Sequence, residues 1–195
     1  MKTKSSVKRG GRTPNFWGRA KSKLTQGFKD KIYSQYYSEE TLYIYCDCSM
    51  NGEGYRMSIA CSYVQRGSVT VSSHIIDLPS DCRGKNIYGE LEALLAGLKE
   101  FEQHIDRFNE NVIIYSDVDH IDHIFSTQAT FKIDSLMKQQ KALIQLLNLK
   151  RSENPDLNIS VEYLSIDFKN YNPFAKSAHN AARKLLNMPT SSFCR

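Results

Sequence analysis

The sequence predicts an α/β fold built on one five-stranded mixed sheet, in which three antiparallel strands are followed by two parallel additions, with helices flanking the sheet. Two observations predict this class. Residues 41–79 contain three alternating apolar and polar runs separated by short turns that contain glycine, the pattern of antiparallel strands. From residue 87 onward, apolar residues recur at helical spacing, and helical stretches then alternate with short apolar runs, as in sheets with parallel strands.

The first three strands are expected to form an antiparallel meander. In residues 41–49, Leu42, Ile44, Cys46 and Cys48 alternate with aromatic or polar residues, so these four side chains share one face of the strand. The stretches NGEG and RGS are turn-forming. They precede the second and third strands, which are expected at 55–65 and 69–79.

The remaining elements alternate between helix and strand. The run NVIIYSD at 111–117 is apolar before its final acid, which suits a central strand covered on both faces. Asn154-Pro155 should end the long helix that begins near residue 133, because the residue before a proline disfavours helical backbone. The other expected elements are helices at 87–105, 119–126 and 173–187 and a strand at 157–166, with a loop before the last helix.

Three carboxylates fall at positions where they can meet. Asp47 lies near the end of the first strand, Asp117 ends the fourth strand, and Glu90 lies one turn into the helix that follows the meander. The carboxyl ends of parallel strands gather at one edge of a sheet. Clustered carboxylates repel one another, so the arrangement predicts divalent cations that balance them.

Each of these acids also has an ordinary interpretation when it is taken alone. Asp117 is a suitable N-cap for the next helix. Glu90 could be a solvated residue near the positive end of a helix, and Asp47 an acid on an edge strand. The joint position of the three acids favours the metal site over three separate explanations.

Four motifs between Asp47 and Ala182 resemble those of the ribonuclease H family, specifically the ribonuclease HI type, and the resemblance covers residues 41–188. The resemblance implies a ribonuclease H-like sheet with this strand order. The motif positions are Asp47-Cys48-Ser49 with Gly52, then Asn86, Glu90, Leu91 and Ala93, then Ser116-Asp117, and finally Ala178-His179-Asn180-Ala181-Ala182.

Two departures from the family pattern concern the fourth ligand. His179 stands where the family usually has an aspartate, although histidine occurs there in some members. The family's mobile histidine, which precedes the last helix, has no counterpart in the stretch DFKNYNPFAKS. Asp167 in that stretch is an alternative source of a carboxylate.

The resemblance implies a metal-dependent endonuclease that hydrolyses the RNA strand of RNA–DNA hybrids with two Mg²⁺ or Mn²⁺ ions. Asp47, Glu90, Asp117 and His179 would be the catalytic residues and the metal ligands. Substrate contacts are expected from Ser49, Gly52 and Asn86. A nucleic-acid-binding module on the same fold, with weak or no hydrolysis, is the alternative. A proofreading exonuclease is disfavoured, because Ser49 stands where that class usually carries glutamate.

Charge divides the chain into two parts. Residues 1–31 hold ten Lys or Arg and one acid, whereas residues 32–195 hold 16 Lys or Arg and 20 acids, so net charges of +9 and −4 sum to the +5 of the whole chain. We expect a basic, aromatic-containing N-terminal segment at 1–38 and a ribonuclease H-like domain at 39–190. A basic segment favours a nucleic-acid partner. The same segment faintly resembles a hybrid-binding domain at Gly11-Arg12, Pro14, Phe16-Trp17, Gly27-Phe28 and Tyr33.

The composition predicts a cytoplasmic protein without a membrane partner, and it leaves the oligomeric state open. There is no apolar run of the roughly 20 residues that cross a bilayer, and no secretory signal is visible after the first lysines. The cysteines are odd in number and lack zinc-finger spacing, so they are expected to be small buried apolar residues in a reducing compartment. They are Cys46, Cys48, Cys61, Cys82 and Cys194.

Overall fold

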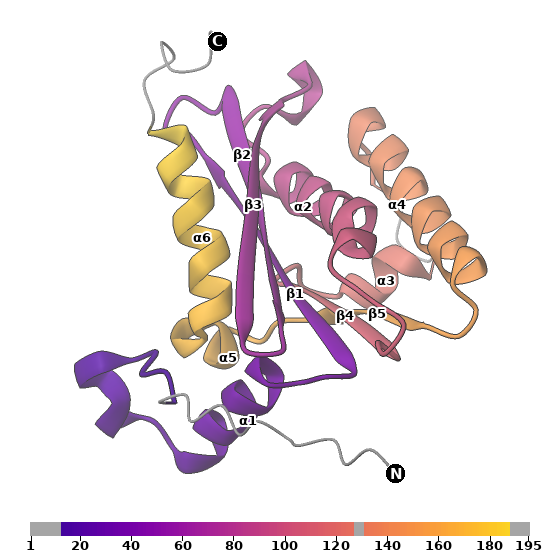
Figure 1. Ribbon diagram of the computed structural model, residues 1–195. Helices are drawn as coiled ribbons and strands as arrows, with labels where there is room; N and C mark the ends of the chain where they lie inside the picture. The colour runs from indigo at the N-terminus through magenta and orange to yellow at the C-terminus, as the bar shows by residue number, and fades with distance from the viewer. Residues whose placement is uncertain (1–12, 127–130, 188–195) are drawn as a thin grey trace, which may run out of the picture.

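The computed structural model describes residues 13–126 and 131–187, and it contains one mixed sheet in the order β3-β2-β1-β4-β5 (Figure 1). β1 pairs antiparallel with β2 and parallel with β4, and β4 pairs parallel with β5. This confirms the predicted sheet of three antiparallel strands and two parallel additions. The strands are β1 Thr41–Met50, β2 Arg56–Gln65, β3 Ser68–Asp77, β4 Asn111–Ser116 and β5 Asn158–Tyr163.

Helices cover both faces of the sheet. α2 and α4 lie on one face and α6 on the other, with α1 and α5 near one end of α6 (Figure 1). The α-helices are α1 Gln26–Tyr36, α2 Asn86–Glu100, α3 Ile121–Phe125, α4 Asp134–Glu153, α5 Ile166–Tyr171 and α6 Pro173–Leu186, and the 3₁₀ helices are η1 Gly18–Lys23, η2 Ser80–Cys82 and η3 Phe101–Gln103. Within the described residues, no helix is long and apolar enough to cross a membrane.

Three helical details differ from the prediction. The helix expected at 87–105 ends at Glu100, because the chain tightens into η3 around the fully buried Phe101 before it turns toward β4. The expected loop before α6 contains α5, which Ser165 caps by accepting from the amide of Phe168. α1 was not predicted, although Thr25 caps it through the amide of Phe28. Both missed helices are too short or too weakly amphipathic to give a clear period.

The core is divided by the sheet. On the α2 face, fully buried aliphatic side chains from the strands and from α2 pack together. On the α6 face, Tyr45 stacks on Tyr115 with ring centroids 5.1 Å apart and donates its hydroxyl proton to Oε1 of Gln35 in α1 at 2.6 Å. The four cysteines within the described residues are free and buried, as predicted, while Cys194 lies outside those residues. The bond from Tyr45 to Gln35 thus attaches α1 to the sheet.

Gly89 shows how closely α2 approaches the sheet, and we predict that Gly89→Ala is destabilising. An added Cβ would overlap the sulfur of Met57 and lie 2.8 Å from Sγ of Cys48. We expect the free energy of unfolding to fall by about 1–3 kcal/mol. In the control Gly27→Ala, at an exposed position of α1, the new methyl group meets no described atom within 4 Å, and the helix should gain about 0.5–1 kcal/mol. Urea unfolding of both variants tests this, and equal effects would contradict it.

Candidate active site

Three carboxylates converge at the edge of the sheet where β1 and β4 end. Asp47 lies two residues after the last residue of β1 that pairs with β4, Asp117 comes directly after β4, and Glu90 lies in the second turn of α2. One ligand oxygen from each acid lies within 4.8 Å of the others. The parallel pairing of β1 with β4 brings these residues together, as the sequence predicted.

Strand alternation decides which side of the sheet each group comes from. Tyr45 belongs to the buried cluster on the α6 face, and Asp47 contacts His179 of α6. Cys46 and Cys48 belong to the cluster on the α2 face, from which Glu90 approaches. The site therefore takes side chains from both layers of helices, at a position where the sheet ends between them.

Asp47 is buried and contacts two basic side chains. It is only 4% exposed. His179 Nδ1 lies 2.8 Å from its Oδ2, and Lys169 Nζ lies 3.4 Å from its Oδ1. Burial raises the pKa of Asp47, and the charges of Lys169 and His179 lower it without cancelling the rise. This carboxylate thus has a basic group beside each oxygen.

Among the described residues, neither oxygen of Glu90 is bonded to a basic side chain. Its Oε1 accepts from Sγ of Cys48 at 3.2 Å, whereas its Oε2 is buried with no hydrogen-bond partner among the described residues. Burial raises the pKa of Glu90 well above its usual range, and the charges of Asp117 and Asp47 add to that rise. A buried oxygen without a partner is costly. The three acids offer only oxygen ligands, and Oε2 of Glu90 is unpartnered among the described residues. These ligands fit a hard divalent cation such as Mg²⁺ or Mn²⁺.

Lys169 is the side chain beside the three acids that sequence reasoning missed. Its Nζ lies 2.5 Å from Oδ2 of Asp117, in addition to its contact with Asp47. Burial lowers the pKa of Lys169, but its bond to Asp117 and the nearby carboxylate charges outweigh this effect and raise it. The signal in the sequence was a basic residue in the stretch before the last helix, where the family carries its mobile histidine.

The two candidates for a fourth ligand lie in different surroundings. His179 is half-buried on α6 beside Asp47. Asp167 is exposed in the first turn of α5. Asp167 and Lys169 are two residues apart, so on a helix their side chains point about 200° apart. Because Lys169 faces the acids, Asp167 points away from them.

The three residues expected to contact substrate lie on the elements that carry Asp47 and Glu90 or in the adjoining turn. Ser49 is half-buried, two residues after Asp47 on β1. Gly52 is exposed in the turn between β1 and β2. Asn86 is exposed at the first position of α2, and its carbonyl oxygen lies 3.6 Å from Sγ of Cys48. Their role in substrate binding stays a prediction.

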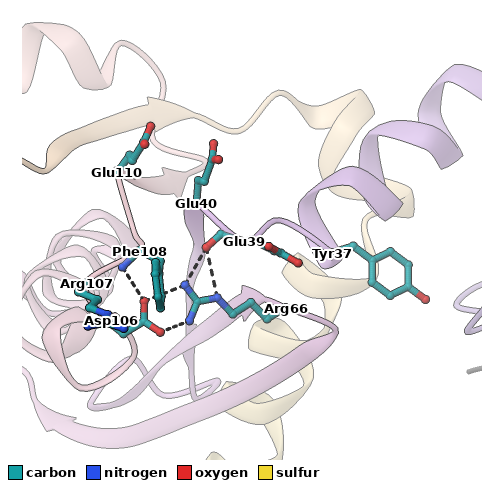
Figure 2. A pocket seen from close by; sticks show the side chains of 8 residues that line it. All are labelled: Tyr37, Glu39, Glu40, Arg66, Asp106, Arg107, Phe108 and Glu110. Carbon is teal, nitrogen blue, oxygen red and sulfur yellow. Dashed lines mark hydrogen bonds and ion pairs between the residues drawn. The ribbon is translucent and has the colours of Figure 1, made fainter. Parts of the chain in front are cut away.

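A hollow of about 910 Å³ lies at the opposite end of β1 and β4 (Figure 2). Arg66 crosses it, donating to both carboxylate oxygens of Asp106 and, at 2.8 Å, to the carbonyl oxygen of Glu39. These bonds link the β2–β3 turn to the segments before β1 and β4. Glu40 and Glu110 line the hollow and directly precede β1 and β4. The hollow is therefore separate from Asp47 and Asp117, which lie toward the other end of these strands.

Comparison with known proteins identifies the fold. No protein-family model matches the sequence, and no curated protein matches it. A ribonuclease H1 from the halophilic archaeon Halobacterium salinarum NRC-1 is 15% identical, with a TM-score of 0.54 over 74% of this chain and 98% of that chain. LC11-RNase H1, solved in complex with an RNA/DNA hybrid, is 18% identical, with a TM-score of 0.53 over 75% of this chain and 99% of that chain.

A third solved structure agrees with these two. An N-terminal ribonuclease H domain from Mycobacterium tuberculosis, fused to maltose-binding protein, is 16% identical, with a TM-score of 0.51 over 76% of this chain and 99% of that chain. These likenesses show that the chain has a ribonuclease H-like fold, as the four sequence motifs predicted. The three carboxylates stand at the strand ends and on the helix where those motifs place them.

The different surroundings of Glu90 and Asp47 predict opposite effects of neutralising them in the protein without metal. Glu90→Gln should raise the free energy of unfolding by about 1–2 kcal/mol, because it removes a buried charge that two other acids repel. Asp47→Asn should lower it by about 1–3 kcal/mol, because it weakens the contacts with Lys169 and His179. Urea unfolding at pH 7 with a chelator measures both changes.

Glu92→Gln on the same helix is the matched control, since Glu92 is half-buried outside the cluster. Its unfolding free energy should stay within about 0.5 kcal/mol of the parent. If Glu90→Gln destabilised the protein as much as Asp47→Asn, repulsion would not be the main cost of burying Glu90.

Proposed function

We propose that this protein is a metal-dependent endonuclease that hydrolyses the RNA strand of RNA–DNA hybrids by a two-metal mechanism. The observation that carries the proposal is the convergence of Asp47, Glu90 and Asp117 within 4.8 Å at the carboxyl ends of parallel strands. The buried, unpartnered oxygen of Glu90 supports a cation there. The fold supports the reaction class by analogy, because fold alone does not fix function.

The residues would hold the ions in two overlapping sets. Asp47, Glu90 and Asp117 would hold one Mg²⁺ or Mn²⁺ ion, and Asp47 with His179 would hold the second. When bound, such ions supply an activated water and stabilise the leaving oxygen of a phosphodiester. His179 is preferred to Asp167 because it already contacts Asp47 at 2.8 Å.

The chain's own groups position these ligands and the substrate. His179 fixes one oxygen of Asp47, and the thiol of Cys48 fixes one oxygen of Glu90. Burial of Asp47 restricts its movement and limits its contact with water. Ser49 and Asn86, which lie on the elements that carry Asp47 and Glu90, would contact the hybrid. Proteins tell RNA from DNA through the 2′-hydroxyl, which a wide and shallow minor groove displays.

A nucleic-acid-binding module with weak or no hydrolysis is the second candidate. The observation that favours it is the contact of Lys169 with both Asp47 and Asp117. This ammonium group already balances two of the acids that would hold metal. An assay of hybrid cleavage against hybrid binding separates the two functions.

Cleavage of a labelled RNA–DNA hybrid tests the proposal. We expect the parent to cut only the RNA strand with Mg²⁺ or Mn²⁺, and Asp117→Asn to reduce the rate at least about 100-fold, the scale of a lost electrostatic group at an active site. Asp122→Asn, an exposed acid on α3, is the matched control and should cut like the parent. Binding without cleavage in the parent would favour the second candidate.

His179 should make the site better suited to Mn²⁺ than to Mg²⁺. Imidazole suits softer ions than carboxylate does, and magnesium prefers oxygen ligands. We therefore expect faster cleavage with Mn²⁺, slower cleavage in His179→Ala, and a gain of Mg²⁺-supported activity in His179→Asp. Rates measured over a range of each ion test this, and equal rates for the parent and His179→Ala with both ions would remove His179 from the site.

Basic residues before the described part of the chain are proposed to strengthen hybrid binding. Residues 1–12 carry five Lys or Arg and no acid. Deleting them should weaken binding and flatten the dependence of log affinity on log salt, because fewer counterions are released from the phosphates. The deletion leaves in place Phe16 and Trp17, which pack on the body. A salt slope equal to that of the parent would show that these charges do not reach the phosphates.

A further inference from the structure

Lys169 occupies a position that a metal ion would also use. Its ammonium group contacts Oδ2 of Asp117 at 2.5 Å and Oδ1 of Asp47 at 3.4 Å. A divalent cation shared by these two acids needs the same oxygens. Binding of a divalent cation by the acids does not require a lysine at this position, and neither does the fold. The presence of Lys169 therefore needs a separate explanation.

The N-terminal segment holds the helix that carries Lys169. Trp17 donates its indole N–H to the carbonyl oxygen of Tyr171, the last residue of α5, at 2.8 Å. Phe28 of α1 packs on Phe168 with ring centroids 5.4 Å apart, and Lys31 Nζ lies 4.5 Å from the centre of the Phe168 ring. In Figure 1, this segment lies next to α5. The residues on both sides of Lys169 are thus attached to residues 17–31.

We propose that Lys169 is an intramolecular competitor of the divalent cation, and that the N-terminal segment sets the metal affinity of the site by positioning α5. The proposal rests on the metal site of the proposed function. It makes Lys169 a residue that decides how much Mg²⁺ or Mn²⁺ the protein needs, and it makes Trp17 a positioning residue that acts through Lys169.

Charge and space both allow this exchange. With Lys169 in place, the formal charge of the three acids and the ammonium group is −2, and it becomes −3 when the ammonium group leaves. A divalent ion is attracted more strongly to the second state. Beside the acids, a hollow of about 240 Å³ is lined by Lys169, Lys176 and His179. It offers the displaced lysine side chain a place next to solvent.

Calorimetric titration with Mn²⁺ in the absence of nucleic acid tests the proposal on the full chain. Lys169→Gln should bind Mn²⁺ at least about tenfold more tightly than the parent, since it removes a positive charge at contact distance. Lys184→Gln is the matched control, because Lys184 is exposed in the last turn of α6, and its affinity should stay within about twofold of the parent. Lys169→Arg keeps the charge and should bind no more tightly than the parent.

Trp17→Phe tests the positioning role, because it removes the N–H donor and keeps an aromatic ring. Its affinity for Mn²⁺ should change in the same direction as in Lys169→Gln and by a smaller factor. Thermal unfolding gives a second readout: Lys169→Gln should melt below the parent with a chelator and should gain more from Mn²⁺.

Each negative result has a defined meaning. An unchanged affinity in Lys169→Gln, or no Mn²⁺ binding by either protein, would overturn the competitor role. If only Trp17→Phe were unchanged, the link to the N-terminal segment would be wrong. Tighter Mn²⁺ binding in Lys169→Gln without cleavage of any hybrid by the parent would uphold this inference and refute the proposed endonuclease.

Discussion

The free-energy cost of burying the carboxylate of Asp47 is the constraint on which the arrangement of this protein depends. A lone buried charge is unstable unless it is paired. Lys169 from α5 and His179 from α6 contact its two oxygens. β1 must therefore meet α5 and α6, whose contacting residues lie 122 and 132 residues further along the chain than Asp47. The same contacts hold the middle of α6 against the sheet and α5 over the acids.

The helix packing on the other face serves the same edge of the sheet. Gly89 leaves no room for a side chain between α2 and β1, so the next residue, Glu90, reaches the ends of the parallel strands. On the α6 face, Tyr45 joins the sheet to Gln35 of α1, and Trp17 joins the N-terminal segment to α5. The aromatic residues of that segment, in which we expected nucleic-acid contacts, include Phe16 and Trp17 packed against the body.

Local patterns in the sequence were sufficient for the sheet and for the three acids. Alternation located β1, and the acids were found because each stands at a strand end or one turn into a helix. Lys169 was missed for a physical reason. It lies 122 residues from Asp47 and 52 from Asp117, on a six-residue helix with no apolar period. An ion pair between distant residues leaves no periodic pattern in the sequence. The sequence predicted that metal ions balance the acids, and in the structure Lys169 supplies positive charge beside two of them.

The two basic groups at the site bear on how folding and metal binding are related. Compared with the family pattern of four carboxylates, histidine removes one negative charge and Lys169 adds a positive one. Both changes reduce the repulsion that would oppose folding without metal. Both also reduce the attraction for a divalent ion. A protein with this site can fold before it binds metal, and under the proposed function its activity then depends on the free concentration of that metal. Glu90 is the exception, since its unpartnered oxygen keeps part of the repulsion that a bound metal ion would relieve.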